Sequence, residues 1–335
     1  MNKKDVSMQT IANKLGCSKV TVFKALNDKQ GVSEELKSQI ITSCIEMGYS
    51  PKKKNKKNSN FIVLTPKSMM MSDEKFFTVI LYHINRLFAA NGDLMNLHLV
   101  DKTEETVLYL QNLHLSQAIH GIFILGEIER ALMDSLIALE IPLVAVDFYF
   151  DGLDFDYVTT NNFHCAYSAT NHLIHSGCKK IGYVGNINET SALIDRYFGY
   201  KKALMENRLN ASEDFNVILE DSSFIVDLVI PENLPDAFIC QSDKIAFLLI
   251  NKLKNIGKFV PDDISVIAFD SSEFAQETEP SITALNIDKK EIAQKAYQLI
   301  QNRISDKTAP VQKIMLMWEI EKRDSTKEIL PSQAV

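Results

Sequence analysis

The sequence is poor in the residues that build metal, disulfide and membrane proteins. Its five cysteines are an odd number without paired CxxC spacing, so we expect buried thiols in a reducing compartment and no zinc site or disulfide. No stretch approaches the roughly 20 apolar residues needed to span a bilayer, and the lysine-bearing start lacks the apolar core of a signal peptide. These absences predict a cytoplasmic protein that binds neither a metal nor a membrane.

Motifs of common enzyme sites are missing as well. The sequence has no glycine-rich phosphate loop, no HExxH and no G-x-S-x-G, and its seven histidines are scattered. His172 and His175 are interpreted as an exposed pair on a helix rather than as metal ligands. We therefore expect no catalytic residues and no cofactor, and a carbohydrate-acting enzyme or an exported solute-binding protein is the less favoured alternative.

The first 50 residues carry a helix-turn-helix pattern. Apolar residues at positions 8, 11, 12 and 15 have helical spacing, and Gly16 ends that helix. Ser18 is placed to cap a second helix, whose apolar residues are Val20, Val22, Phe23 and Leu26. A third helix is predicted between Ser33, its cap, and Gly48, its stop. Two short helices joined by a tight turn are typical of a unit that places its second helix in the DNA major groove.

The charge distribution also indicates DNA binding. Residues 1–60 hold twelve lysines against five acidic residues, a net charge of +7, so the remainder holds 24 basic and 38 acidic residues, a net charge of −14. A basic head concentrates the attraction for phosphates in one small part of the molecule. The acidic body is repelled by phosphates, which reduces nonspecific binding of DNA to the rest of the chain. A three-helix bundle that merely packs against the rest of the chain would not need this asymmetry.

Residues 51–60 are interpreted as a lysine-rich linker, and a two-part α/β body follows it. Short apolar runs, expected to be strands, alternate with longer amphipathic stretches, expected to be helices. Strands are predicted at 61–65, 94–100, 121–125, 142–147, 180–185, 216–219, 237–241 and 264–269. Helices are predicted at 74–91, 104–115, 130–139, 165–176, 197–207 and 244–256. The order predicts parallel sheets with helices on both faces, in two lobes with a cleft between them.

Several motifs in a fixed order resemble the lactose-repressor (LacI/GalR) family of transcription regulators. The head carries V-S-M-Q-T-I-A-N-K-L-G-C-S-K-V-T-V-F-K-A-L-N, then G-V-S-E-E-L-K and E-M-G-Y-S-P. The body carries I-P-L-V-A-V-D at 141–147, D-R-Y-F-G-Y-K-K-A-L at 195–204, P-D-D-I-S-V-I-A-F-D at 261–270 and R-D-S-T at 323–326. The resemblance implies a headpiece at 1–50 and a periplasmic-binding-protein-like body at 61–330. Its lobes would span about 61–160 and 161–290, with a final segment that crosses back.

The resemblance assigns DNA contacts to the second helix and the linker. These residues are Ser18, Lys19, Val20, Thr21, Lys24, Asn27, Lys52, Lys53 and Lys54. Lysine donates to guanine, a valine methyl packs on thymine, and hydroxyls suit phosphate oxygens. Val20 has the alternative of lying in the headpiece core. The linker lacks the leucine with which relatives wedge open the minor groove, since Asn58 stands there, so its lysines either follow phosphates or form a flexible tether.

For the effector cleft the resemblance points to residues at strand ends and loop starts. They are Phe76, Asp147, Asn161, Arg196, Asp243 and Asp270, and Asn162 stands next to the asparagine. Carboxylates, amides and an arginine bind vicinal hydroxyls in pairs, which favours a sugar-like ligand. Alternatively, Asp270 only caps a turn and Arg196 only forms a surface ion pair. Because Asn161 replaces the usual acid and residues 69–71 are methionines, either the ligand is atypical or the cleft has lost its effector.

The resulting hypothesis is a transcriptional regulator, a repressor, whose affinity for operator DNA is controlled by a small polar metabolite. Two headpieces related by a two-fold axis would read an inverted-repeat operator, so we expect a homodimer. The predicted helix at 74–91 has apolar residues on more than one face, which suits contact with a partner as well as with its own sheet. The alternative is a DNA-binding regulator whose cleft serves only dimerisation or a protein partner.

Overall fold

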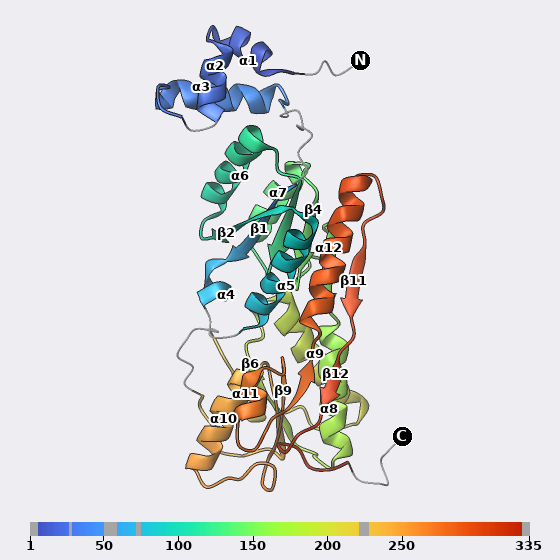
Figure 1. Ribbon diagram of the computed structural model, residues 1–335. Coiled ribbons are helices and arrows are strands. Elements are labelled where there is room, and N and C mark those ends of the chain that lie inside the picture. The colour runs from blue at the N-terminus through green and yellow to red at the C-terminus, as the bar shows by residue number, and fades with distance from the viewer. Residues whose placement is uncertain (1–5, 27–28, 50–58, 72–74, 221–227, 330–335) are drawn as a thin grey trace.

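The computed structural model describes residues 6–26, 29–49, 59–71, 75–220 and 228–329. A small helical headpiece lies at one end of an elongated molecule, followed by two α/β lobes (Figure 1). The headpiece is built from α1 (Met8–Leu15), α2 (Lys19–Leu26) and α3 (Glu34–Glu46). Gly16 ends α1 in the left-handed conformation at φ 63°, and the Ser33 hydroxyl caps α3 by accepting from the Leu36 amide, as the pattern predicted.

The first lobe is a parallel sheet with the strand order β11-β5-β4-β3-β1-β2. Its strands are β1 (Asn60–Pro66), β2 (Leu94–Val100), β3 (Gly121–Leu125), β4 (Leu143–Val146), β5 (Asp156–Thr160) and β11 (Lys313–Leu316). Its helices are α4 (Lys67–Met71), α5 (Phe76–Asn91), α6 (Thr103–Gln117), α7 (Arg130–Ala138) and α12 (Lys289–Ser305). Because α5 and α12 pack on one face and α6 and α7 on the other, the central strands are buried on both sides.

The second lobe repeats this architecture with the strand order β12-β10-β9-β8-β6-β7, parallel except that β12 runs antiparallel to β10. Its strands are β6 (Ile181–Gly185), β7 (Val217–Ile218), β8 (Ala237–Cys240), β9 (Ser265–Phe269), β10 (Thr283–Asn286) and β12 (Glu319–Glu321). Its helices are α8 (Asn162–His175), α9 (Ser191–Glu206), the 3₁₀ helix η1 (Glu213–Phe215), α10 (Asp243–Asn255) and α11 (Glu273–Glu277). Helices α8 and α9 cover one face of the sheet, and α10 and α11 cover the other.

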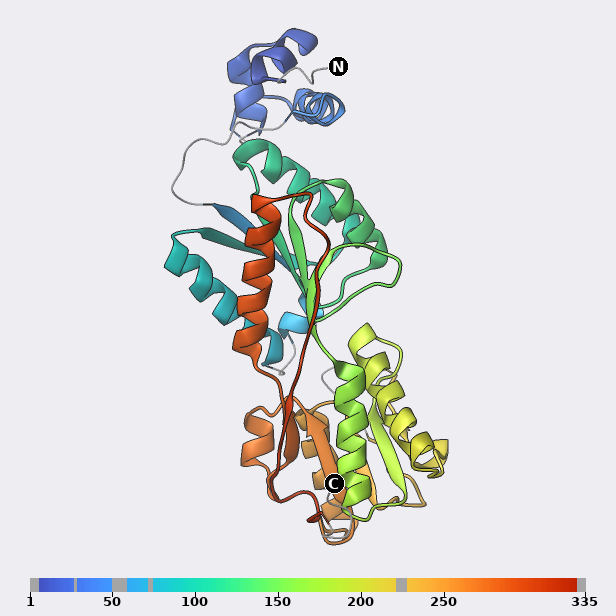
Figure 2. The ribbon, with the colours of Figure 1, turned by 90° about the vertical axis from the view of Figure 1, so that its right-hand side faces the viewer.

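The chain passes between the lobes after β5, after β10 and after β11 (Figure 2). The third of these passages places Trp318 between β11 and β12, where it packs against the apolar cores of both lobes. It is the only tryptophan in the sequence. Its indole therefore reports on the place where the two lobes join.

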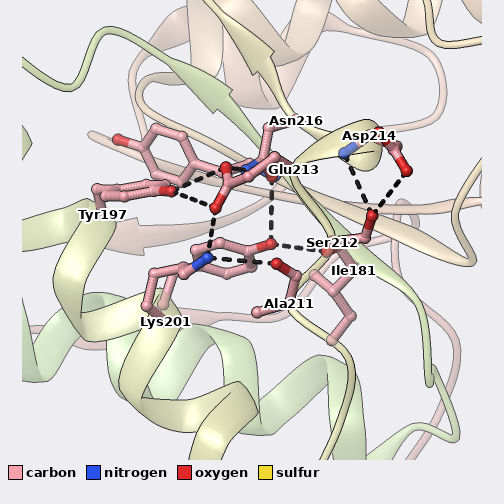
Figure 3. Close-up of polar contacts among 10 residues, drawn as sticks. Ile181, Tyr197, Lys201, Ala211, Ser212, Glu213, Asp214 and Asn216 are labelled. Carbon is pink, nitrogen blue, oxygen red and sulfur yellow. Dashed lines mark hydrogen bonds and ion pairs between the residues drawn. The ribbon is translucent and has the colours of Figure 1, made fainter.

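The segment after α9 is tied back to that helix through Glu213 (Figure 3). The Glu213 carboxylate accepts hydrogen bonds from the Tyr197 hydroxyl, at 3.0 and 3.1 Å, and from the Lys201 ammonium at 2.5 Å. It also accepts from Asn216 Nδ2 at 2.6 Å, while Asn216 Oδ1 accepts from the Tyr183 amide of β6 at 2.8 Å. This network positions the short edge strand β7 beside β6.

The headpiece rests on the first lobe through α6. Both α2 and α3 contact this helix, and Leu115, near its end, belongs to the same apolar cluster as the headpiece core residues Ile11, Ile40 and Tyr49. Of the predicted DNA contacts, Asn27, Lys52, Lys53 and Lys54 lie outside the described residues, as does Asn58. Within the described part of the chain, no helix combines the length and apolar character needed to cross a bilayer.

Most predicted elements are present with shifted ends. The largest shift is in α9, which begins at Ser191 rather than at 197 because the Thr190 hydroxyl caps it by accepting from the Leu193 amide. The strands β5, β10, β11 and β12 and the helices α4, α11, α12 and η1 had not been predicted. The second apolar face of α5, interpreted as a surface for a partner, packs largely against α12, and Phe77, Leu81 and Leu87 join that core.

Candidate nucleic-acid interface and effector cleft

Helix α2 has a buried face and an outward face. Val22, Ala25 and Leu26 point into the headpiece core. Lys19 is exposed, and Val20 is 62% exposed, so the alternative that Val20 belongs to the headpiece core is wrong. Val22, two positions further along the helix, points inward and occupies the headpiece core in its place. The outward face thus presents a cation and a free apolar methyl pair from adjacent positions.

Ser18 and Thr21 are occupied in starting the helix. The Ser18 hydroxyl accepts a hydrogen bond from the Thr21 amide at 3.0 Å, and the two hydroxyl oxygens are 2.8 Å apart. The pair satisfies one of the free amides at the beginning of α2. A phosphate at this end would meet the remaining amides and the positive end of the helix dipole.

The candidate effector residues come from the carboxyl ends of parallel strands. Asp147 follows β4 and Asp270 follows β9, and both have left-handed backbone, with φ of 69° and 87°. The Asp147 amide donates to the Val158 carbonyl and the Asp270 amide to the Leu285 carbonyl, which fixes each residue to a neighbouring strand. Since the strands of each sheet end at the gap between the lobes, the two aspartates face the same region.

Arg196 on α9 lies at the centre of this region. Its Nε donates to Asn162 Oδ1 at 2.9 Å, its Nη1 donates to the Gln241 carbonyl at 2.6 Å, and its guanidinium lies 4.2 Å from the centre of the Phe269 ring. Nη2 is 3.9 Å from Asp270 Oδ1, and both side chains are largely buried. The alternative of a surface ion pair is therefore wrong, because Arg196 is only 6% exposed.

A cavity of about 260 Å³ lies between the lobes beside this cluster. Three of the predicted residues, Phe76, Asp243 and Asp270, line it. Lys289 lines it as well, donating to the Asp270 carbonyl at 3.0 Å and lying 5.5 Å above the Phe76 ring. Asp243 accepts from the Ser272 amide at 2.5 Å, which ties α10 to the loop before α11. The cavity is thus bounded by polar groups and by the aromatic residues Phe76 and Phe274.

Burial controls the ionisation of the cleft carboxylates. Burial raises the pKa of Asp147 to about 7, Arg196 opposes that rise, and Asp270 and Glu127 add to it. The Asp147 Oδ1 atom is buried without a hydrogen-bond partner. Burial, with Asp270 nearby, also raises the pKa of Asp243. Burial therefore shifts both carboxyl groups toward their protonated, uncharged form.

The structure brings together Asp147, Arg196 and Asp270, while Asp243 and Phe76 lie on the adjacent cavity wall. The predicted residue Asn161 instead caps α8, where its Oδ1 accepts a hydrogen bond from the His164 amide at 3.1 Å. Its neighbour Asn162 is the residue that reaches Arg196. Which of the two adjacent asparagines faces the arginine depends on where α8 begins, and the sequence alone did not define that point.

Sequence reasoning missed several groups at the cleft. Glu127 and Lys289 both act on the charge of Asp147, and Gln241 offers its carbonyl to Arg196. Lys289 opens the helix α12, which was not predicted, so no signal pointed to it. Glu127 follows β3 at the same sheet edge as Asp147, and its place after a buried strand was the one available clue.

The described residues contain no cluster of three or more histidine, cysteine or acidic side chains arranged for a metal. Four of the cysteines are buried and Cys17 is partly exposed, all with free thiols. His172 is not the exposed helix residue that was expected. It is buried on the inner side of α8, and burial lowers the pKa of its imidazole to about 4.

Comparison with known proteins agrees with this architecture. The family model of the periplasmic binding protein-like domain matches residues 170–326. The HTH-type transcriptional repressor PurR of Vibrio atlanticus is 24% identical, with 96% of this chain and 99% of that protein aligned. The same repressor from Haemophilus influenzae is 26% identical over 97% of this chain and 99% of that protein.

Solved structures show the same fold. The transcriptional regulator CelR in complex with cellobiose superposes with a TM-score of 0.71 at 20% identity, covering 96% of this chain and 99% of that one. The LacI family transcriptional regulator CCPA of Weissella paramesenteroides with bound glucose has a TM-score of 0.67 at 23% identity, covering 80% of this chain and 98% of that one.

The fold and the cleft together define a periplasmic-binding-protein-like body joined to a helix-turn-helix headpiece. The nearly full-length similarity to curated repressors confirms the resemblance drawn from the sequence motifs. The chain is similar over nearly its whole length to HTH-type transcriptional repressors, and it shares the fold of solved LacI family transcriptional regulators.

Proposed function

We propose that this chain is a sequence-specific DNA-binding transcriptional repressor that binds an inverted-repeat operator as a homodimer. The observation that carries the proposal is the outward face of α2, where Lys19 and Val20 are exposed while Val22 and Ala25 anchor the helix to the headpiece core. A rigid helix with a cation and a methyl-bearing side chain on its free face suits the major groove.

The effector proposed for the interlobe cleft is a small hydroxyl-rich molecule such as a sugar. The cleft offers carboxylates, an amide and an arginine, which are the groups that pair with vicinal hydroxyls. Carboxyl groups outnumber basic groups there, with Asp147, Asp243, Asp270, Glu127 and Glu273 against Arg196, Lys75 and Lys289. This balance favours an uncharged ligand over a phosphorylated one.

An apolar edge of the first lobe supports self-association. Leu94, Leu97 and Leu99 are exposed on β2, the strand at the edge of the sheet, and Tyr82 and Leu108 are exposed on the adjoining α5 and α6. An uncovered edge strand with apolar side chains is a surface that pairs readily with another copy. This surface replaces the second face of α5 as the proposed dimer contact.

The DNA-binding proposal is tested by fluorescence anisotropy on DNA from upstream of the chain's own gene. Replacing Lys24, which is partly buried on α2, with alanine is expected to weaken operator binding by ~1–3 kcal/mol and to weaken binding to random DNA less. Lys202→Ala, at an exposed lysine of the second lobe, is the matched control and should leave both affinities unchanged. A wild-type chain that binds both DNAs with equal affinity would contradict sequence-specific recognition.

The effector proposal is tested by the melting temperature of the full chain with a library of sugars, nucleosides and sugar phosphates. A ligand that binds the folded state raises that temperature. Arg196→Ala or Asp270→Ala should abolish the rise for a cleft ligand. A neutral sugar that stabilises both variants as well as the wild type would place its site elsewhere.

A further inference from the structure

Two apolar side chains, those of Val20 and Phe23, lie on the outward face of α2. Phe23 was predicted as one of the apolar residues of this helix, yet it is 43% exposed, and Val20 is 62% exposed. Neither belongs to the apolar cluster of the headpiece, which includes Val22, Ala25 and Leu26 of the same helix. Because residues three positions apart are neighbours on a helix surface, Val20 and Phe23 form one apolar pair, the α2 pair.

Three lysines surround the α2 pair. Lys19 directly precedes Val20 and is exposed, and Lys24 directly follows Phe23 and is partly buried. Lys29, beyond the end of α2, places its ammonium 5.3 Å from the centre of the Phe23 ring, and its amide donates to the Lys24 carbonyl at 3.0 Å. An apolar surface surrounded by positive charge suits a polyanion that also presents apolar groups. The major groove of DNA, lined by phosphates, is such a partner.

The apolar group that the major groove presents is the C5 methyl of thymine. The Cβ atoms of residues three positions apart on a helix are separated by about 5–6 Å. Successive nucleotides of one strand rise by about 3.4 Å, so the α2 pair spans one to two base steps. A cytosine or a purine at either place would leave an apolar side chain against a polar base edge, which costs binding free energy. The spacing of the pair therefore suits two thymines that are adjacent or one base apart.

We propose that Phe23 is a specificity-determining residue, which reads a thymine methyl group one or two base pairs from the thymine that Val20 contacts. This inference rests on the proposed function, in which α2 enters the major groove of an operator half-site. The Lys29 ammonium beside the ring holds the phenylalanine in place by a cation–π contact and adds positive charge near the phosphates. Each half-site should therefore contain two nearby thymines, one for each side chain of the α2 pair.

The proposal is tested with deoxyuridine, which pairs with adenine as thymidine does but lacks the C5 methyl group. The full chain first selects its preferred duplex from a library of random sequences. Each thymine of one half-site is then replaced singly by uracil, and the affinity is measured by fluorescence anisotropy. The wild type is expected to lose about fourfold in affinity at each of two nearby thymines, the value of one buried methyl group, and little at the others.

Two variants assign the sensitive thymines to side chains. Phe23→Ala should abolish the effect of uracil at one of them, and Val20→Ala should abolish it at the other. Phe198→Ala, at a phenylalanine of the second lobe that is 56% exposed, is the matched control and should retain both effects. If Phe23→Ala has lost the circular dichroism spectrum of the folded protein, Phe23→Gln, with a side chain of similar length, replaces it.

The outcomes separate this inference from the proposed function. A wild-type chain that selects a defined operator but binds it equally well with uracil at every thymine would overturn the inference and leave the proposed function standing. Uracil effects that persist at both thymines in a folded Phe23 variant would also overturn it, because another residue would then contact the methyl group. A chain that selects no sequence at all would contradict the proposed function, and this inference with it.

Discussion

His172 is a histidine held neutral by its surroundings. It lies on α8 with Nε2 3.5 Å from the Thr326 hydroxyl, where the final segment passes beneath the helix. Burial, the nearby Lys322 and His175 all lower the pKa of its imidazole, to about 4 in the folded chain against 6.5 for an ordinary histidine. A base with this depressed pKa binds its proton more readily when the chain unfolds.

The protein should therefore lose stability as the pH falls from about 6.5 toward 4. In that window the unfolded chain carries a proton on His172 and the folded chain does not, so the free energy of unfolding decreases with decreasing pH. His172→Gln is expected to flatten the dependence of melting temperature on pH across this range. His164→Gln, at an exposed histidine of the same helix, should retain the wild-type slope. Equal slopes for all three proteins would contradict the assignment.

At the scale of elements, α8 and α9 of the second lobe approach each other closely at Gly199. Gly199 on α9 faces the Phe163 carbonyl of α8, and a Cβ placed on this glycine would lie 2.0 Å from that oxygen and 3.0 Å from Ala166 Cβ. Backbone atoms cannot yield as a flexible side chain can. The glycine thus allows the two helices to approach closely and to share one apolar core.

Gly199→Ala is expected to lower the free energy of unfolding by about 1–3 kcal/mol, as overpacking of a dense core usually does. Alanine favours a helix more than glycine by up to ~1 kcal/mol, so a net loss would show that packing outweighs propensity. Urea denaturation followed by circular dichroism measures the difference. Met205→Ala, at an exposed position of the same helix, provides the comparison and should change stability little. A more stable Gly199→Ala protein would mean that the helices separate at no cost.

On the scale of the whole molecule, the exposed apolar edge of the first lobe determines the expected assembly. Charged residues at Leu97 and Leu99 of β2 would bring uncompensated carboxylates into the proposed contact between two copies. Leu97→Glu with Leu99→Glu is expected to shift the protein from dimer to monomer in size-exclusion chromatography with light scattering. The same pair of changes should weaken operator binding, because two linked headpieces bind more tightly than one.

Ile256→Glu with Phe259→Glu, on an exposed apolar part of the second lobe, is the comparison for that experiment. If this pair dissociates the dimer and the β2 pair does not, the contact lies on the second lobe. If the wild-type chain is monomeric at micromolar concentration, both free and on DNA, neither apolar surface is a dimer contact.

The sequence by itself determined the headpiece and the alternation of strands and helices. Ser18, Gly16 and Ser33 act on amides and turns within a few residues of themselves. The helix ends that they define can therefore be predicted from the neighbouring sequence alone. Strands that are buried on both faces, such as β1 and β3, can likewise be recognised in the sequence as continuous apolar stretches. The strand-end aspartates Asp147 and Asp270 were predictable for the same reason, since each directly follows such a run.

Only the tertiary structure decided which side chains share the cleft. Glu127 meets Ser191 across 64 residues and Tyr149 meets Asp195 across 46, in pairs that no local pattern connects. Whether Asn161 or Asn162 reaches Arg196 depended on the first turn of α8, and whether Val20 faced outward depended on how α2 packs on its neighbours. These outcomes follow from how each helix packs on its neighbours and how the two lobes meet, and a shift of one residue along a helix turns a side chain by about 100°. Local propensity does not contain that information.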